Sequence, residues 1–236
     1  MKILMLTWEY PPRVVGGISR VVYDLSRTLL KDGHEVTVVT YKEGDAPEFE
    51  DDKGVKVYRV NNYMINPNNF IDWIMQLNFN LVAKASEIIA TEGKFDVIHA
   101  HDWLVAYAAK TLKNSYNIPI VSTIHATEAG RNSGIHDETQ RYINDTEWML
   151  TYESSEVIVN SKYMKNELQR LFGLPYEKIN DFRKYIEKEN LETGGIGPRL
   201  RPVVSCIGTD CRYGLTDTLS LSDEIHERIY NKYKNV

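Results

Sequence analysis

Short apolar runs that alternate with helical patterns limit the folds open to this chain more than any other feature. The runs predicted to be strands are Lys2–Leu6, Val36–Thr40, Val55–Val60, Phe95–His101, Ile118–Thr123 and Val157–Val159. Apolar residues at helical spacing predict helices from about Ser19 to Leu30, and at Phe70–Thr91, Trp103–Leu112, Glu138–Ser154 and Lys162–Phe172. Strands that are apolar on both faces and separated by helices indicate an α/β fold, a parallel sheet with helices on both faces.

Two local expectations follow from the same patterns. Val55–Val60 is expected to lie beside Val36–Thr40 in the sheet, because consecutive strands usually pair or neighbour one another. The acidic stretch Glu43–Lys53 between them is predicted to be a solvated loop. Gly33 is expected to end the first helix, since glycine is favoured just after a helix C-terminus.

The composition favours a globular chain without a nucleic-acid or membrane partner. The 236 residues are 42% hydrophobic and 26% charged, which is enough to bury a core in one or two domains. A formal net charge of -5 and a pI near 5.7 oppose general binding to nucleic acids or membrane surfaces. No apolar run approaches the roughly 18 residues of a membrane span, and Met1-Lys2 leads into a strand and not into a signal peptide. We therefore expect a cytoplasmic protein; its oligomeric state is left open.

The segment after the first strand has the features of a phosphate-facing loop. It carries Glu9, then the adjacent glycines Gly16 and Gly17, and then the first helix. Glycines let the backbone approach a ligand closely, and a helix N-terminus presents free N–H groups and a positive dipole end, which suits an anionic sugar nucleotide. The spacing is not that of a dinucleotide fingerprint or a Walker loop. A plain tight turn is an equal alternative for this segment.

Polar residues gather where the other predicted strands end, and ligands of parallel sheets bind beyond these ends. The candidates are Glu9, His99, His101, Asp102, His125, Thr127, Glu128 and Ser161. His99 is expected to be a buried histidine that donates to a backbone carbonyl. Asp102 has a second interpretation as a helix N-cap, followed by Trp103 as an apolar anchor. His99 and His101 share a strand face and so raise a metal hypothesis, but no third ligand has compatible spacing, and we expect no metal.

Four ordered motifs resemble the N-terminal domain of glycogen and starch synthases and related GT-B glycosyltransferases, closest to the archaeal type. The motifs are Thr7–Pro12 with Gly16-Gly17, Asp96–Trp103, Ser122–His125 and Val157–Ser161, and the resemblance covers residues 1–180. It implies a Rossmann-like domain that forms the acceptor-side half of a GT-B fold. It also implies retaining transfer of glucose from UDP- or ADP-glucose to an α-1,4-glucan, without a metal or another cofactor.

The resemblance also implies roles for residues at matching positions. Gly16 and Gly17 would approach the donor pyrophosphate, and His125, as a neutral imidazole, would hydrogen-bond the transferring sugar. Asp102 and Trp103 would border the sugar and the acceptor. We therefore take His125 and Asp102 as candidate catalytic residues. The candidate substrate-binding residues are Gly16, Gly17, Trp103, His101 and Glu9.

Residues 181–236 depart from the glycogen synthase pattern and are predicted to be a segment of different origin that follows or completes the sheet. Members of the family continue into a second domain that supplies most donor contacts, so we expect this chain alone to be inactive. Residues 193–233 resemble a cluster-binding segment of nitrite and sulfite reductases, and they end in a predicted helix, Leu219–Tyr233. Such a cluster needs four thiolates, whereas the chain has only Cys206 and Cys211. An inactive recombined or engineered chimera, and a redox or iron–sulfur fragment that uses these two cysteines, remain alternatives.

Overall fold

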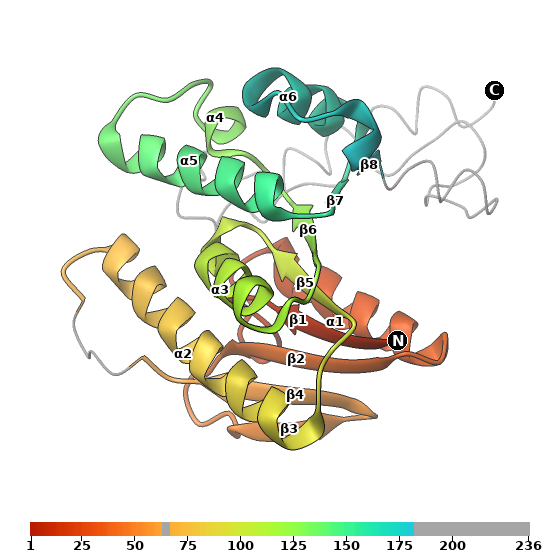
Figure 1. The fold of residues 1–236 in the computed structure, drawn as a ribbon. Helices are drawn as coiled ribbons and strands as arrows, with labels where there is room; N and C mark the ends of the chain where they lie inside the picture. The colour runs from red at the N-terminus through yellow and green to blue at the C-terminus, as the bar shows by residue number, and fades with distance from the viewer. Residues whose placement is uncertain (63–66, 182–236) are drawn as a thin grey trace, which may run out of the picture. The chain divides into compact units, whose positions relative to one another are not determined.

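Eight strands form a single sheet in the computed structural model, which describes residues 1–62 and 67–181. The strand order is β3-β4-β2-β1-β5-β6-β7-β8, and all neighbours are parallel except β3 and β4 (Figure 1). The strands are β1 (Lys2–Leu6), β2 (Glu35–Tyr41), β3 (Phe49–Asp52), β4 (Val55–Val60), β5 (Val97–His101), β6 (Ile120–Ile124), β7 (Glu156–Val159) and β8 (Ile179–Asp181). The predicted α/β, Rossmann-like parallel sheet is confirmed.

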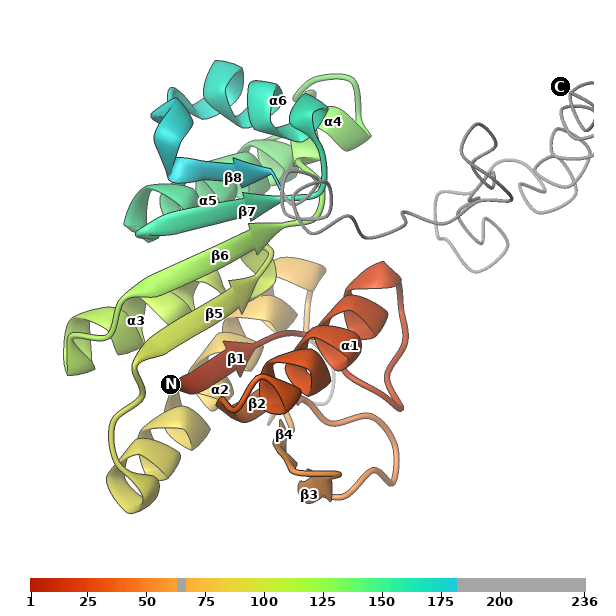
Figure 2. The ribbon, with the colours of Figure 1, turned by 90° about the vertical axis from the view of Figure 1, so that its right-hand side faces the viewer.

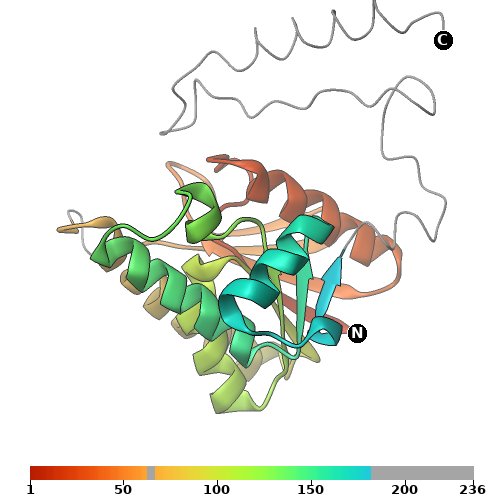
Figure 3. The same ribbon diagram turned by 90° about the horizontal axis from the view of Figure 1, so that it is seen from above.

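Helices cover both faces of this sheet. They are α1 (Gly17–Lys31), α2 (Phe70–Glu92), α3 (Ala106–Tyr116), α4 (Glu128–Arg131), α5 (Glu138–Glu153) and α6 (Lys162–Phe172), with 3-10 turns η1 (Trp103–Val105) and η2 (Tyr176–Lys178). Figures 2 and 3 show α1 on one side of the sheet and α2, α3 and α5 on the other. Each side has its own hydrophobic core: α1 packs on one, while α2, α3, α5 and α6 contribute to the second.

Strand β1 shows why the strands could be recognised as apolar runs. Its side chains alternate between the two faces, so Ile3 and Met5 enter the core under α1, whereas Leu4 and Leu6 enter the other core. All four are buried. A strand buried on both faces needs apolar residues at consecutive positions, which is the pattern in the sequence.

The acidic stretch Glu43–Lys53 corrects one prediction. Its second half forms β3, which pairs antiparallel with β4, so the stretch is not a solvated loop throughout. Strand β4 lies beside β2, as predicted. The acidic side chains are used at this edge of the sheet. Asp52 accepts a hydrogen bond from the Tyr10 hydroxyl at 2.9 Å and pairs with Arg27 at 2.5 Å. The acidic residues of this stretch therefore form ion pairs and hydrogen bonds within the fold.

Other boundaries differ by one turn or less. Helix α1 begins at Gly17 and not at Ser19, and Gly33, with a φ of 82°, lies one residue beyond the capping residue Asp32. The predicted helix Trp103–Leu112 begins as η1 and continues as α3 until Asn117, whose φ of 52° is left-handed. The short elements α4 and β8 were not predicted.

Several expectations concern residues that the structure does not describe. The resemblance at 193–233, the pair Cys206 and Cys211, and the helix predicted at Leu219–Tyr233 all lie outside the described residues. Within residues 1–62 and 67–181, no helix has both the length and the apolar character that crossing a bilayer requires.

Candidate functional site

Most of the polar residues predicted to meet at one edge of the sheet lie just beyond the C-terminal ends of β1, β5 and β6. We call this place the carboxyl edge. Glu9 follows β1, Asp102 follows β5 and His125 follows β6, and the charges of Asp102 and Glu9 both act on the His125 imidazole. The parallel register of β1, β5 and β6 brings the three together from distant parts of the sequence.

The glycine loop at this edge leaves room for a ligand. Gly16 and Gly17 are both exposed, and neither has a positive φ. Among the described residues, a Cβ added at Gly17 would meet nothing within 4 Å, and one at Gly16 would meet only a Glu9 oxygen, at 3.7 Å. The fold therefore does not need glycine at Gly17. Since α1 begins there, its first-turn N–H groups have no acceptor within the helix.

Glu9 is part of the loop's own structure. Its Oε2 accepts hydrogen bonds from the backbone N–H groups of Val15 at 2.6 Å and Gly16 at 2.9 Å, and the residue is 1% exposed. The carboxylate thus already occupies two of the loop's amides. An incoming phosphate would find the free N–H groups from Gly17 onward, so substrate contact by Glu9 itself stays a prediction.

Two contacts fasten the same loop to the segment that follows β2. The Tyr10 hydroxyl reaches Asp52 of β3, and the Arg13 guanidinium pairs with Glu43 at 2.7 Å. Both carboxylates belong to the stretch predicted to be a solvated loop. These contacts fix the backbone that leads into Gly16, and a fixed backbone presents its N–H groups to a ligand without first having to be ordered.

Three histidines form a stack across β5 and β6. The ring centroids of His99 and His101 are 4.3 Å apart, and those of His101 and His125 are 5.5 Å apart. Nδ1 of His101 lies 3.2 Å from Nε2 of His125, which is hydrogen-bonding distance. His99 Nε2 lies 2.8 Å from the Thr123 hydroxyl, so the prediction that His99 donates to a backbone carbonyl is wrong.

Burial keeps these imidazoles neutral. It lowers the pKa of His99 from 6.5 to about 4, and it lowers the pKa of His101 well below 6.5. The pKa of His125 is also lowered, mainly by burial and also by the charge of Arg131, although Asp102 and Glu9 act in the opposite direction. At pH 7 each ring therefore has one N–H donor and one bare nitrogen.

The unpaired nitrogen of His101 determines which atom of His125 faces a ligand. His101 is fully buried, and its Nε2 has no hydrogen-bond partner among the described residues. Buried N–H groups without a partner are rarer than acceptors without one, so the favoured tautomer has the proton on Nδ1. That N–H donates to His125 Nε2. His125 then carries its own proton on Nδ1, which is left to donate to a ligand.

Asp102 holds the backbone of this site in an uncommon conformation. Its φ of 61° and ψ of 173° lie in a region that non-glycine residues rarely occupy, at a cost of about 1–3 kcal/mol. Its N–H donates to the Thr123 carbonyl at 3.0 Å, and its Oδ1 accepts the His125 N–H at 2.9 Å. Asp102 occupies the N-cap position of η1, as the second interpretation expects, but its side chain makes no capping hydrogen bond. Strain of this kind is concentrated at functional sites.

Two predicted substrate contacts are buried in the described structure. His101 is 0% exposed, and Trp103 is 3% exposed with its ring edge against Phe70, 6.1 Å between centroids. Trp103 is buried in the hydrophobic core, as expected of an apolar anchor. Direct contact of either residue with a substrate stays a prediction.

Helices α4 and α5 bring two further residues to the carboxyl edge, Arg131 and Glu147, that sequence reasoning did not select. Arg131 Nη2 lies 3.6 Å from Asp102 Oδ2, and both carboxylate oxygens of the buried Glu147 accept the Glu128 N–H, at 2.9 and 3.1 Å. Burial raises the pKa of Glu147 to about 8. The one available signal was Thr127, whose hydroxyl caps α4 by accepting the N–H three residues later.

No metal-binding group of three His, Cys, Asp or Glu side chains is found within residues 1–62 and 67–181. His99 and His101 share a strand face, and their ring nitrogens lie within hydrogen-bonding distance of Thr123 and His125. The chemistry available at this edge is hydrogen bonding from neutral imidazoles and from helix amides.

Comparison with known families decides the identity of this domain. The sequence model described as "Glycosyltransferase Family 4" matches residues 15–180, which include both glycines and the whole histidine stack. The chain belongs to glycosyltransferase family 4. The predicted resemblance to an N-terminal GT-B glycosyltransferase domain is thereby confirmed.

Relatives and solved structures of glycosyltransferases agree with this assignment. The chain is 40% identical over 179 residues to an uncharacterised glycosyltransferase of Methanocaldococcus jannaschii, covering 76% of this chain and 45% of that protein. It is 35% identical over 216 residues to a glycogen synthase of Mycobacterium tuberculosis, covering 86% of this chain and 52% of that protein. The fold is similar to sucrose-phosphate synthase from Thermosynechococcus elongatus, with a TM-score of 0.64, 18% identity, and coverage of 81% of this chain and 53% of that one.

The chain spans about half the length of the curated relatives it matches.

Proposed function

We propose that this domain is the acceptor-side half of a glycogen synthase-like glycosyltransferase, which transfers glucose from UDP- or ADP-glucose to an α-1,4-glucan with retention of configuration. In this reaction the bond between the glucose C1 and the diphosphate oxygen breaks. A new bond forms from C1 to the acceptor's 4-hydroxyl oxygen, and the hydroxyl proton leaves with the diphosphate. Residues 1–180 form the domain in this proposal, and 181–236 are a separate segment.

The observation that carries the proposal is the convergence of an open helix N-terminus at Gly17 and a neutral donor at His125 on one edge of the sheet. Negative charge develops on the departing diphosphate, and backbone N–H groups beyond Gly17 bind that charge more strongly in the transition state than in the ground state. The 35% identity to a glycogen synthase supports glucose as the transferred sugar.

The roles of the remaining residues follow from their contacts. His125 Nδ1–H donates to a hydroxyl of the transferring sugar, while its Nε2 is occupied by His101. Asp102 acts on His125 by holding its backbone N–H. Arg131 neutralises part of the Asp102 charge beside the site. Both Asp102 and His125 would therefore shape the sugar site, and Asp102 does so through His125.

Titration of the whole chain with UDP-glucose and ADP-glucose, followed by calorimetry and NMR, tests the proposal. We expect saturable binding that His125→Ala abolishes and that Gly17→Ala weakens, because the added Cβ meets no atom of the described residues within 4 Å and would project into the ligand's space. His136→Ala removes an exposed histidine and is the matched control. An absence of binding up to millimolar concentrations of both nucleotides would refute the proposal.

A further inference from the structure

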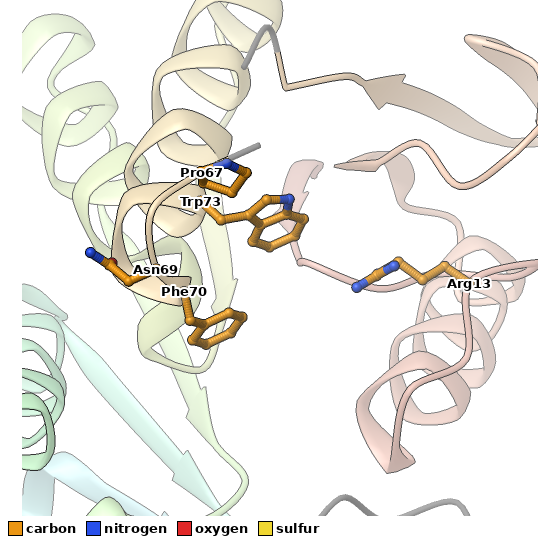
Figure 4. A pocket seen from close by; sticks show the side chains of 5 residues that line it. All are labelled: Arg13, Pro67, Asn69, Phe70 and Trp73. Atoms are coloured by element: carbon orange, nitrogen blue, oxygen red, sulfur yellow. The ribbon is translucent and has the colours of Figure 1, made fainter. Parts of the chain in front are cut away.

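A second site lies beside the carboxyl edge, at the N-terminal end of α2. A pocket of about 290 Å³ is lined there by Arg13, Pro67, Asn69, Phe70 and Trp73. Figure 4 shows the two aromatic side chains from the start of α2 directed toward Arg13, which comes from the loop before α1. The pocket is close in volume to the smallest that hold small ligands, about 300 Å³.

The start of α2 fixes the aromatic wall. Asn69 caps the helix by accepting the Asp72 N–H at 2.9 Å, so α2 begins at Phe70. Phe70 and Trp73, which are three residues apart, therefore both lie on the first turn of the helix. Their rings are nearly parallel, with an interplanar angle of 7° and centroids 6.0 Å apart. Trp73 also packs against Tyr41, with centroids 4.9 Å apart. Phe70 is 44% exposed, so this wall keeps apolar ring surface in contact with solvent.

Arg13 is held in place opposite this wall. Its guanidinium carbon lies 5.0 Å from the Tyr41 ring centroid, 5.1 Å from that of Trp8 and 5.7 Å from that of Trp73. Nη1 pairs with Glu43, whereas Nε has no hydrogen-bond partner among the described residues. A guanidinium fixed between rings is an oriented hydrogen-bond donor at the pocket wall.

The charges around the pocket favour a neutral ligand. Glu43 balances the positive charge of Arg13, and Asp72 adds a negative charge next to Asn69. A phosphate group would therefore meet no net positive charge. A sugar ring fits better, because its C–H face packs on aromatic rings while its hydroxyls accept from a guanidinium or an amide.

Phe70 links the pocket lining to the residues of the candidate active site. The Phe70 ring contacts Trp103 edge-on, at 6.1 Å between centroids, and Trp103 directly follows Asp102 in the sequence. Arg13 lies in the same loop as Gly16. We propose that the pocket formed by Arg13, Phe70 and Trp73 binds a neutral sugar ring of the acceptor chain. This rests on the proposed function, since it assigns an acceptor subsite to that reaction.

Maltoheptaose is the probe, and Phe70→Ala is the decisive variant of the whole chain. Phe79→Ala is the matched control, because it removes the same side chain from the same helix at a position that is 72% exposed. We expect Phe70→Ala to bind maltoheptaose about tenfold more weakly than the wild type, because it loses one aromatic contact of about 1.4 kcal/mol. The affinity of Phe79→Ala for maltoheptaose should equal that of the wild type. Arg13→Gln should also weaken binding, and glucose 6-phosphate should not compete with maltoheptaose.

Three results would overturn the subsite: no binding of maltoheptaose to the wild-type chain, equal binding by wild type and Phe70→Ala, or an equal loss in both phenylalanine variants. The donor titration is read separately. If the chain binds maltoheptaose through Phe70 but binds no nucleotide-glucose, the subsite stands and the transfer function fails. If the chain binds nucleotide-glucose but its affinity for maltoheptaose does not depend on Phe70, the subsite alone fails.

Discussion

The buried histidine stack predicts a specific sensitivity to acid. His99 has a pKa of about 4 in the folded protein and about 6.5 when exposed in the unfolded chain, so the unfolded state binds the proton more tightly. The stabilising contribution of the neutral ring is complete above pH 6.5 and is lost as the pH falls toward 4. At about 1.4 kcal/mol per pKa unit, His99 alone removes about 2.5 kcal/mol between pH 7.5 and 4.5. That is a large part of a typical folding free energy of about 5–15 kcal/mol.

The variant His99→Gln isolates this effect, because glutamine can still hydrogen-bond the Thr123 hydroxyl but does not titrate. Urea unfolding at a series of pH values gives the free energy of unfolding for each protein. We expect the loss between pH 7.5 and 4.5 to be about 2.5 kcal/mol smaller in the variant. His136→Gln, at an exposed position, should follow the wild type.

The comparison is made between variant and wild type, so the titration of groups that do not interact with His99, Glu147 among them, cancels. If His99→Gln and the wild type lose the same free energy over this range, the ring is not held neutral by burial. The account of the histidine stack would then be refuted, and with it the tautomer assigned to His125.

Two further substitutions test buried polar groups. Burial raises the pKa of Glu147 to about 8, so the folded state binds this proton more tightly than the unfolded state does. The free energy of unfolding therefore falls as the pH rises from 4.5 to 8. At pH 8.5, the free energy of unfolding of Glu147→Gln should exceed that of the wild type by more than about 1 kcal/mol. The buried Asn78 donates to the carbonyls of Ile74 and Leu104 and accepts the Ala108 N–H. Asn78→Ala should cost about 2–3 kcal/mol in urea unfolding. Asn80→Ala removes a hydrogen bond to the Gln76 carbonyl and a long one, 3.5 Å, to Asn62 Oδ1, and should cost clearly less.

Much of the fold was predictable because most of its strands are buried on both faces. Such strands need consecutive apolar residues, and this pattern is visible in a single sequence. The acidic stretch failed as a prediction because the charges of Glu50 and Asp52 resemble those of a loop, while their partners Arg59 and Arg27 lie 9 and 25 residues away in the sequence. Helix α4 has four residues, too few to show a helical period.

For the candidate site, the sequence predicted which residues lie at the carboxyl edge but not the contacts among them. Strand ends identified Glu9, Asp102 and His125, because parallel strands bring their C-terminal ends together. The contacts among them depend on the register between β5 and β6, which places His101 opposite Thr123. No local pattern encodes that register. For the same reason, neither the stacking of His101 on His125 nor the hydrogen bond that Asp102 accepts from the His125 N–H could be foreseen.

The central position of β1 has a consequence for synthesis on the ribosome. β1 precedes both of its neighbours in the sequence, β2 ending at Tyr41 and β5 beginning only at Val97. At about 5–20 residues per second, roughly 3–11 s separate the emergence of those two strands. During that interval the edge of β1 that will pair with β5 has no partner, and its apolar sequence can pair with another chain. A nascent chain of this protein is therefore most prone to aggregate, and most in need of a chaperone, before β5 has emerged.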